Sequence, residues 1–99
     1  MSHRGSVLCL PSGIHAWPVS EPAAITLEAL APVLAEAGRI GLLLIGTGSA
    51  RWALPAELLS AFARHKISAE TSKTGQAANT YNILLEEGRQ VAAALIAVD

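Results

Sequence analysis

The chain has 99 residues, a length that suits a single hydrophobic core, and we expect residues 1–99 to form one domain. With 52% hydrophobic and only 15% charged residues, its composition excludes an intrinsically disordered protein. Seven Lys and Arg residues stand against eight Asp and Glu residues, so no surplus of positive charge indicates nucleic-acid binding.

Several features are typical of a cytoplasmic protein. The apolar runs are shorter than the roughly 18 residues that a membrane-spanning helix requires, so we expect no transmembrane segment. A strand-like pattern begins at residue 6, so we expect no signal or transit peptide. The single cysteine, Cys9, has no partner for an internal disulfide, as in a reducing compartment. Its apolar neighbours predict a buried and unreactive thiol.

The apolar pattern predicts an initial hairpin followed by alternating helices and strands. Strands are expected at about 6–10, 13–19, 39–47, 67–71 and 91–98, and helices at about 26–37, 55–66 and 75–87. Pro18 favours an edge position for the second strand. The run at 39–47 has no polar alternation, which is typical of a strand buried on both faces. The order β-β-α-β-α-β-α-β predicts an α/β domain with a mixed central sheet.

Local signals mark the ends of the predicted helices. Thr26 and Thr74 are plausible N-caps, and Pro55 suits a first helical turn. Pro32 conflicts with a helix that begins at Thr26, so either this helix kinks or its regular part begins later. The helical side chains expected to face the core are Leu27, Leu30, Leu34, Leu58, Leu59, Phe62, Ala77, Ala78, Tyr81, Leu84 and Leu85.

The stretch LLLIGTGSAR (42–51) resembles a phosphate-binding turn, because its glycines follow a buried strand and precede a helix. Gly46 and Gly48 fit the first two positions of G-x-G-x-x-G, but Arg51 occupies the third, and no Gly-Lys-Ser/Thr of a P-loop is present. We therefore favour a structural turn, in which glycine allows close packing and, at Gly48, a positive φ. ATP, GTP and NAD are not expected to bind. A small anion near Gly48, Ser49 and Arg51 is the alternative.

The sequence offers no clear catalytic or metal-binding group. The only aspartate is Asp99, so a Ser-His-Asp triad would need a glutamate in its third role. His3, His15 and His65 show no metal-ligand spacing with one another or with Cys9. We therefore predict no catalytic residue, no metal site and no cofactor.

The helix predicted after Thr74 carries a row of polar residues beside its apolar ones. Asn79, Asn82 and Glu86 fall at i, i+3 and i+7 and share one helix face. This row, together with Arg89, is a candidate site. The alternative is a solvated face on which Arg89 pairs with a neighbouring glutamate.

The chain resembles the small α/β domain family of unknown function that includes mitochondrial complex I assembly factor three and the adipogenesis-associated domain proteins. Three stretches carry the resemblance: GSVLCLPSGIHAWPV, LLLIGTGS and TGQAANTYNILLEEGRQVAAALI. The resemblance implies a three-layer α/β fold with a mixed sheet, no established cofactor and no established enzymatic activity. The family's signature residues correspond to Trp17, Gly46, Thr47, Gly48, Thr74, Ala77, Thr80, Tyr81, Asn82, Glu86 and Arg89. Relatives often have Met-Asp where this chain has Ser72 and Lys73, and they usually begin with an added N-terminal segment.

Two functional hypotheses follow. The first is a non-enzymatic interaction or assembly protein of the bacterial cytoplasm, with a protein partner and a link to respiratory-complex assembly, as the family's best-understood mitochondrial relative implies. The second is a small-ligand or anion-binding protein, or an enzyme, with a cleft between the Gly46–Ser49 turn and the Thr74 helix start and with Arg51 or Arg89 as its cation. The candidate ligand or partner surface comprises Gly46, Thr47, Gly48, Ser49, Arg51, Thr74, Asn79, Asn82, Glu86 and Arg89.

Overall fold

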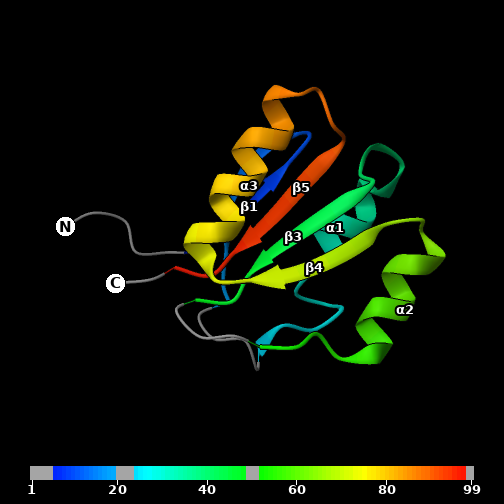
Figure 1. The fold of residues 1–99 in the computed structure, drawn as a ribbon. Helices are drawn as coiled ribbons and strands as arrows, with labels where there is room; N and C mark the ends of the chain where they lie inside the picture. The colour runs from blue at the N-terminus through cyan, green and yellow to red at the C-terminus, as the bar shows by residue number, and fades with distance from the viewer. Residues whose placement is uncertain (1–5, 20–23, 49–51, 98–99) are drawn as a thin grey trace.

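The computed structural model describes residues 6–19, 24–48 and 52–97, which form one sheet with helices on both faces (Figure 1). The strands are β1 (Ser6–Leu10), β2 (Gly13–Trp17), β3 (Leu42–Gly46), β4 (Ser68–Ser72) and β5 (Val91–Leu95). The helices are α1 (Ala31–Ala35), α2 (Ala56–Arg64) and α3 (Thr74–Glu86), with a short 3₁₀ helix, η2 (Ala37–Arg39). The predicted order of strands and α-helices is therefore confirmed.

The sheet is mixed, with the strand order β2-β1-β5-β3-β4. Strands β5, β3 and β4 run parallel, whereas β1 runs antiparallel to both β5 and β2. The hairpin pairs Leu10 with Gly13, whose φ of 137° favours glycine at the turn. β2 forms one edge of the sheet, as the position of Pro18 predicts, and β4 forms the other.

β3 lies in the middle of the parallel strands and is buried on both faces, as its unbroken apolar sequence predicts. Leu43 belongs to the buried cluster that contains Val33 of α1 and Phe62 of α2. Leu44 belongs to the cluster on the other face, which contains Ala77 of α3. The sheet thus has α1 and α2 on one face and α3 on the other, which confirms three layers. Among the described helices, none is long and apolar enough to cross a membrane.

The first helix is shorter than expected. It begins at Ala31 rather than near Thr26, with Pro32 in its first turn, so the later of the two alternative starts is confirmed. The reason is that proline lacks an N–H and is tolerated at a helix start but not in the interior. The Thr26 hydroxyl still accepts a hydrogen bond from the Ala29 N–H, at 3.1 Å, in the turns before the helix. Leu27, expected in the core, is 39% exposed because it lies in these turns.

Two more leucines expected in the core are exposed. Leu59 is 42% exposed and Leu85 is 51% exposed. Each directly follows a leucine that packs against the sheet, namely Leu58 in α2 and Leu84 in α3. Since consecutive helical residues point about 100° apart, only one leucine of each pair can face the sheet.

The two glycines after β3 meet structural requirements, as predicted. Gly48 has a φ of 86°, a conformation that strains other residues. At Gly46 the requirement is space, because an added Cβ would lie 2.8 Å from the Cα of Thr74 and 3.1 Å from a methyl carbon of Leu95. A side chain at this position would therefore push the backbone of α3 away from the sheet.

Gly46→Ala is expected to lower the free energy of unfolding by about 1–3 kcal/mol, the usual cost of overpacking a core. Gly38→Ala is the matched control, because no atom would lie within 4 Å of its added Cβ. Urea unfolding measures both variants. Equal stability of the two would contradict the close approach of α3 to Gly46.

Candidate functional site

The carboxyl ends of the three parallel strands meet in a hydrogen-bonded junction. The Ile96 N–H donates to the Gly46 carbonyl at 2.9 Å, which joins the ends of β5 and β3. The Thr47 N–H and hydroxyl both donate to the Ser72 carbonyl, at 2.9 and 3.2 Å, which joins β3 to β4. Thr47 is only 2% exposed, so these bonds form in the interior of the protein.

Thr74 connects this junction to α3. The prediction that it is the N-cap is wrong, because Lys73 holds that position and Thr74 is the first helical residue. Its hydroxyl donates to the Ile96 carbonyl at 2.7 Å and accepts from the Gly48 N–H at 2.8 Å. Its own N–H donates to the Gly48 carbonyl at 2.9 Å. One threonine therefore ties α3 to the segments that follow β3 and β5.

The turn from Gly46 to Gly48 does not present its amides to a phosphate. The N–H groups of Thr47 and Gly48 both bond within the protein, and all three residues of the turn are buried. A nucleotide-binding turn needs amides that point at the ligand and a helix that begins directly on the phosphates, whereas α2 begins only at Ala56. The geometry supports a structural turn, and the failure of nucleotides to bind stays a prediction. Ser49 and Arg51 lie outside the described residues.

The other candidate residues lie along α3 and do not gather at this turn. Asn79, Asn82 and Glu86 are exposed on the outer side of the helix. Arg89 follows the far end of α3, which its 13 residues place about 18 Å from Thr74 at about 1.5 Å per residue. Arg89 borders a depression at the opposite end of the strands. The expectation that it supplies a cation beside Thr74 is therefore wrong.

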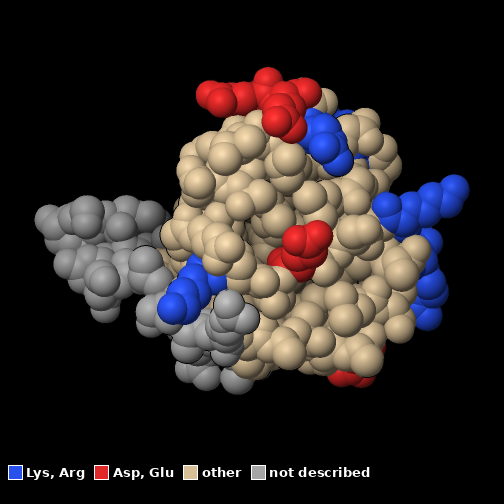
Figure 2. Space-filling model, viewed as in Figure 1, with Lys and Arg blue, Asp and Glu red and all other residues tan. Residues whose placement is uncertain are grey.

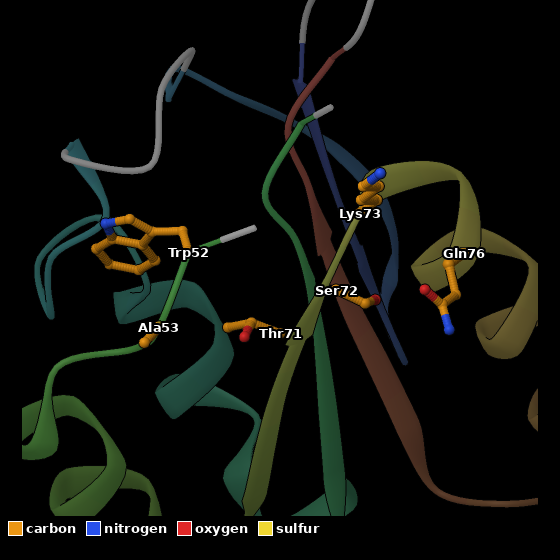
Figure 3. A pocket seen from close by; sticks show the side chains of 6 residues that line it. All are labelled: Trp52, Ala53, Thr71, Ser72, Lys73 and Gln76. Carbon is orange, nitrogen blue, oxygen red and sulfur yellow. The ribbon is translucent and has the colours of Figure 1, made fainter. Parts of the chain in front are cut away.

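A pocket opens at the carboxyl end of β4, with a volume of about 460 Å³ (Figure 3). It is lined by Trp52, Ala53, Thr71, Ser72, Lys73 and Gln76. Trp52 and Ala53 belong to the segment that leads from β3 to α2, whereas the other residues belong to the end of β4 and the start of α3. Figure 3 shows Thr71 directed toward Ala53, and Ser72 and Gln76 on the other side of β4.

None of these pocket residues is among the site residues predicted from the sequence. A signal was present for Thr71 and Lys73, because they lie at the carboxyl end of a predicted parallel strand, where α/β proteins bind ligands. Trp52 is separated from them by a whole helix in the sequence. Only the tertiary structure brings the two segments together.

A second polar cluster joins the β1–β2 turn to the end of α1. The Ser12 hydroxyl donates to the Glu36 carboxylate and lies 3.0 Å from Nε2 of His15, and Arg39 pairs with Glu36 at 2.9 Å. The bond from Ser12, with a smaller effect of the Arg39 charge, holds the pKa of Glu36 below its usual value. A catalytic triad needs the histidine between the serine and the acid, whereas here the serine lies between them. Within the described ranges Arg39–Glu36 is the one ion pair, so Arg89 has no paired glutamate.

Cys9 and Tyr81 lie in the apolar layer between the sheet and α3. Cys9 is 5% exposed, buried as predicted, and burial raises the pKa of its thiol. Burial also raises the pKa of Tyr81, with a further contribution from Cys9. Raised pKa values keep both groups protonated near neutral pH, the opposite of what an activated nucleophile requires. Among the described residues, no three His, Cys, Asp or Glu side chains gather to hold a metal ion.

These features define a small three-layer α/β domain with a five-stranded mixed sheet and a closed junction at the carboxyl end of its parallel strands. The chain belongs to the family described as Protein of unknown function (DUF498/DUF598), which matches residues 1–96. This confirms the family resemblance found in the sequence.

Solved structures confirm the fold. The chain is similar to a structure described as an outer membrane protein from Bartonella henselae, with a TM-score of 0.93 and 46% identity, over 100% of this chain and 83% of that one. It is also similar to a Bordetella pertussis protein described as a Mth938-like domain, with a TM-score of 0.81 and 28% identity, over 94% of this chain and 73% of that one.

The curated relatives include an uncharacterized bacterial protein and a vertebrate assembly factor. An uncharacterized protein of Rhodobacter capsulatus is 36% identical over 94 residues, which cover 95% of this chain and 70% of that protein. NADH dehydrogenase [ubiquinone] 1 alpha subcomplex assembly factor 3 of Danio rerio is 35% identical, and that of Homo sapiens is 32% identical, each over 92 residues and 93% of this chain. The chain spans about half the length of these vertebrate proteins, 53% and 50% respectively.

Thr74→Val removes the hydroxyl of the junction and keeps the shape of the side chain. Because the Gly48 N–H and the Ile96 carbonyl lose their partner in a partly buried place, we expect the free energy of unfolding to fall by about 1–3 kcal/mol. Thr74→Ser keeps the hydroxyl, so its free energy of unfolding should fall by clearly less. Urea unfolding and amide hydrogen exchange at Gly48 measure the difference. An equal loss in both variants would show that packing, rather than the hydroxyl, holds α3.

Ser12→Ala is expected to raise the pKa of Glu36 toward its ordinary value, since the bond from Ser12 is the main cause of the lowered pKa. A lowered folded-state pKa stabilises the fold above the unfolded-state pKa, and this contribution disappears as the pH falls through the folded-state pKa. The variant should therefore lose less stability on acidification than the parent. Carbon-13 NMR titration of the Glu36 carboxyl measures the pKa, with Ser60→Ala on exposed α2 as the control. An unchanged Glu36 pKa in Ser12→Ala would refute the assignment.

Proposed function

We propose that the protein is a non-enzymatic interaction module that assists the assembly of a protein complex, and that a respiratory complex is its target. The relatives named as NADH dehydrogenase assembly factors support this proposal. A location in the bacterial cytoplasm is part of the proposal, and the relative in Rhodobacter capsulatus supports a bacterial setting. The observation in the structure that carries the proposal is an uncharged, partly apolar surface on the α3 side of the sheet.

The outer side of α3 carries no charge over most of its length. No residue from Thr74 to Leu85 is charged. The exposed residues of this segment are Gly75, Gln76, Asn79, Asn82, Ile83 and Leu85. Figure 2 shows an uncharged area over α3, with charged side chains at the top of the view and one acidic side chain near the centre of the face. A helix that faces only solvent usually carries charged residues, whereas the centres of protein interfaces are depleted of them.

The apolar part of this surface continues from α3 onto the β1–β2 hairpin. Tyr81 packs against the buried cluster that contains Cys9 of β1, and Leu85 follows Tyr81 by one helical turn on the same flank. Ile14 pairs with Cys9 across the hairpin, so it projects on the α3 face of the sheet, where it is 72% exposed. We define the α3–hairpin surface as five exposed or partly exposed residues, namely Ile14, Ala16, Tyr81, Asn82 and Leu85.

The arrangement distinguishes this surface from an isolated exposed leucine, which needs no explanation. Ile14 and Leu85 come from distant parts of the sequence, yet both lie on the side of the sheet that α3 covers. Leu59 is similarly exposed at 42% but lies on α2, on the opposite face. Leu59 therefore provides a control for surface substitutions.

Deletion of the gene in the organism that encodes the chain should reduce the amount of assembled NADH dehydrogenase, measured by native gel electrophoresis of solubilised membranes. The parent gene should restore the complex. A chain with Ile14→Arg and Leu85→Arg should not, because an unpaired charge in an interface centre costs about 2 kcal/mol or more, roughly 30-fold in affinity. Both positions are exposed, so the variant is expected to stay folded.

Leu59→Arg is the matched control and should restore the complex as well as the parent does, provided that both variants accumulate to equal levels. Normal complex levels in the deletion strain would refute the proposed function. Equal failure of Leu59→Arg and of the double variant would refute the α3–hairpin surface as the partner site.

A further inference from the structure

The pocket at the end of β4 lies where the connections that follow two neighbouring strands run to opposite faces of the sheet. β3 and β4 are parallel neighbours. The connection from β3 runs to α2 on one face of the sheet, whereas the connection from β4 runs to α3 on the other. In open α/β sheets a crevice forms where adjacent strands part in this way, and such crevices are the usual ligand sites.

The pocket draws residues from both connections, as such a crevice should. Trp52 and Ala53 belong to the connection from β3, and Lys73 to the connection from β4 (Figure 3). Its volume of about 460 Å³ lies within the roughly 300–1,000 Å³ of small-molecule sites. The space is large enough for a compact organic molecule.

The lining differs between the two sides of β4. On one side lie the indole of Trp52 and the methyl group of Ala53, with Thr71 directed toward them. On the other side lie the Ser72 hydroxyl and the Gln76 amide, near the Lys73 position between strand and helix. One side thus offers an apolar wall and the other offers hydrogen-bond donors with a positive charge.

The charge of the pocket favours an anion. Lys73 forms no ion pair with any described carboxylate, and none of the described residues that line the pocket is acidic. The N–H groups of Gly75 and Gln76, in the first turn of α3, have no acceptor within the helix. These groups and the helix dipole add to the charge of Lys73.

We infer that this pocket binds a small organic anion, whose carboxylate or phosphate lies at Lys73 and Gln76 and whose planar apolar part lies against Trp52. This ligand site is distinct from the partner surface, because Gln76 and Leu85 are nine positions apart on α3 and so lie on opposite flanks of the helix. The inference does not rest on the proposed assembly function, and either can fail without the other.

Titration with phenyl phosphate and with benzoate, followed by amide NMR of the whole chain, tests the inference. Saturable shifts are expected at Lys73, Gly75 and Gln76 and at the indole N–H of Trp52. The buried Trp17, whose indole N–H bonds to the Ala29 carbonyl at 2.8 Å, should not respond. Inorganic phosphate lacks the aromatic ring and benzyl alcohol lacks the anionic group, so both should bind more weakly than phenyl phosphate.

Lys73→Gln is expected to weaken binding of phenyl phosphate about tenfold, since it removes a charge-assisted hydrogen bond. Arg64→Gln, which makes the same change in net charge in the last turn of α2, should leave the affinity unchanged. Trp52→Leu should weaken the binding of phenyl phosphate but leave the binding of inorganic phosphate unchanged, provided that the amide spectrum shows the variant to be folded. No saturable shift with either anion, or equal effects of Lys73→Gln and Arg64→Gln, would overturn the inference.

Discussion

The position of α3 at the carboxyl end of the sheet depends on two hydrogen bonds of the Thr74 hydroxyl. The hydroxyl bonds at once to the Gly48 N–H and to the Ile96 carbonyl, and so holds α3 against the ends of β3 and β5. This approach requires a glycine at position 46, because a Cβ there would lie 2.9 Å from the hydroxyl oxygen. Gly46 and Thr74 therefore form one constraint, in which the missing side chain provides the space that the hydroxyl occupies.

The same constraint decides where other molecules can reach the protein. The turn after β3 is closed by its own hydrogen bonds, whereas a pocket opens one strand farther out, at the end of the edge strand β4. With α3 held over β3 and β5, the β1–β2 hairpin extends beyond the helix and keeps Ile14 exposed. A protein partner beside Leu85 and a small anion beside Gln76 would then use opposite flanks of one helix.

Much of the architecture was predictable because burial leaves a local pattern in the sequence. The unbroken apolar run of β3 indicated a strand covered on both faces, and the glycines after it indicated close packing and a positive φ. The errors arose where local pattern leaves a choice. Adjacent leucines do not reveal which of them faces the sheet, so the prediction that Leu59 and Leu85 face the core is wrong. Thr74 suited an N-cap, but its hydroxyl found partners that are distant in the sequence.

By itself, the sequence determined the element order, the mixed α/β class, the family and the structural character of the glycine turn, because each depends on periodicity, backbone conformation or neighbouring residues. Only the tertiary structure decided the strand order and the location of the pocket. Trp52 and Lys73 are brought together by the crossover from β3 through α2 to β4, and Arg89 is carried to the far end of α3. The physical reason is that contacts between distant segments depend on how helices and strands pack around a shared core, and no local pattern records that packing.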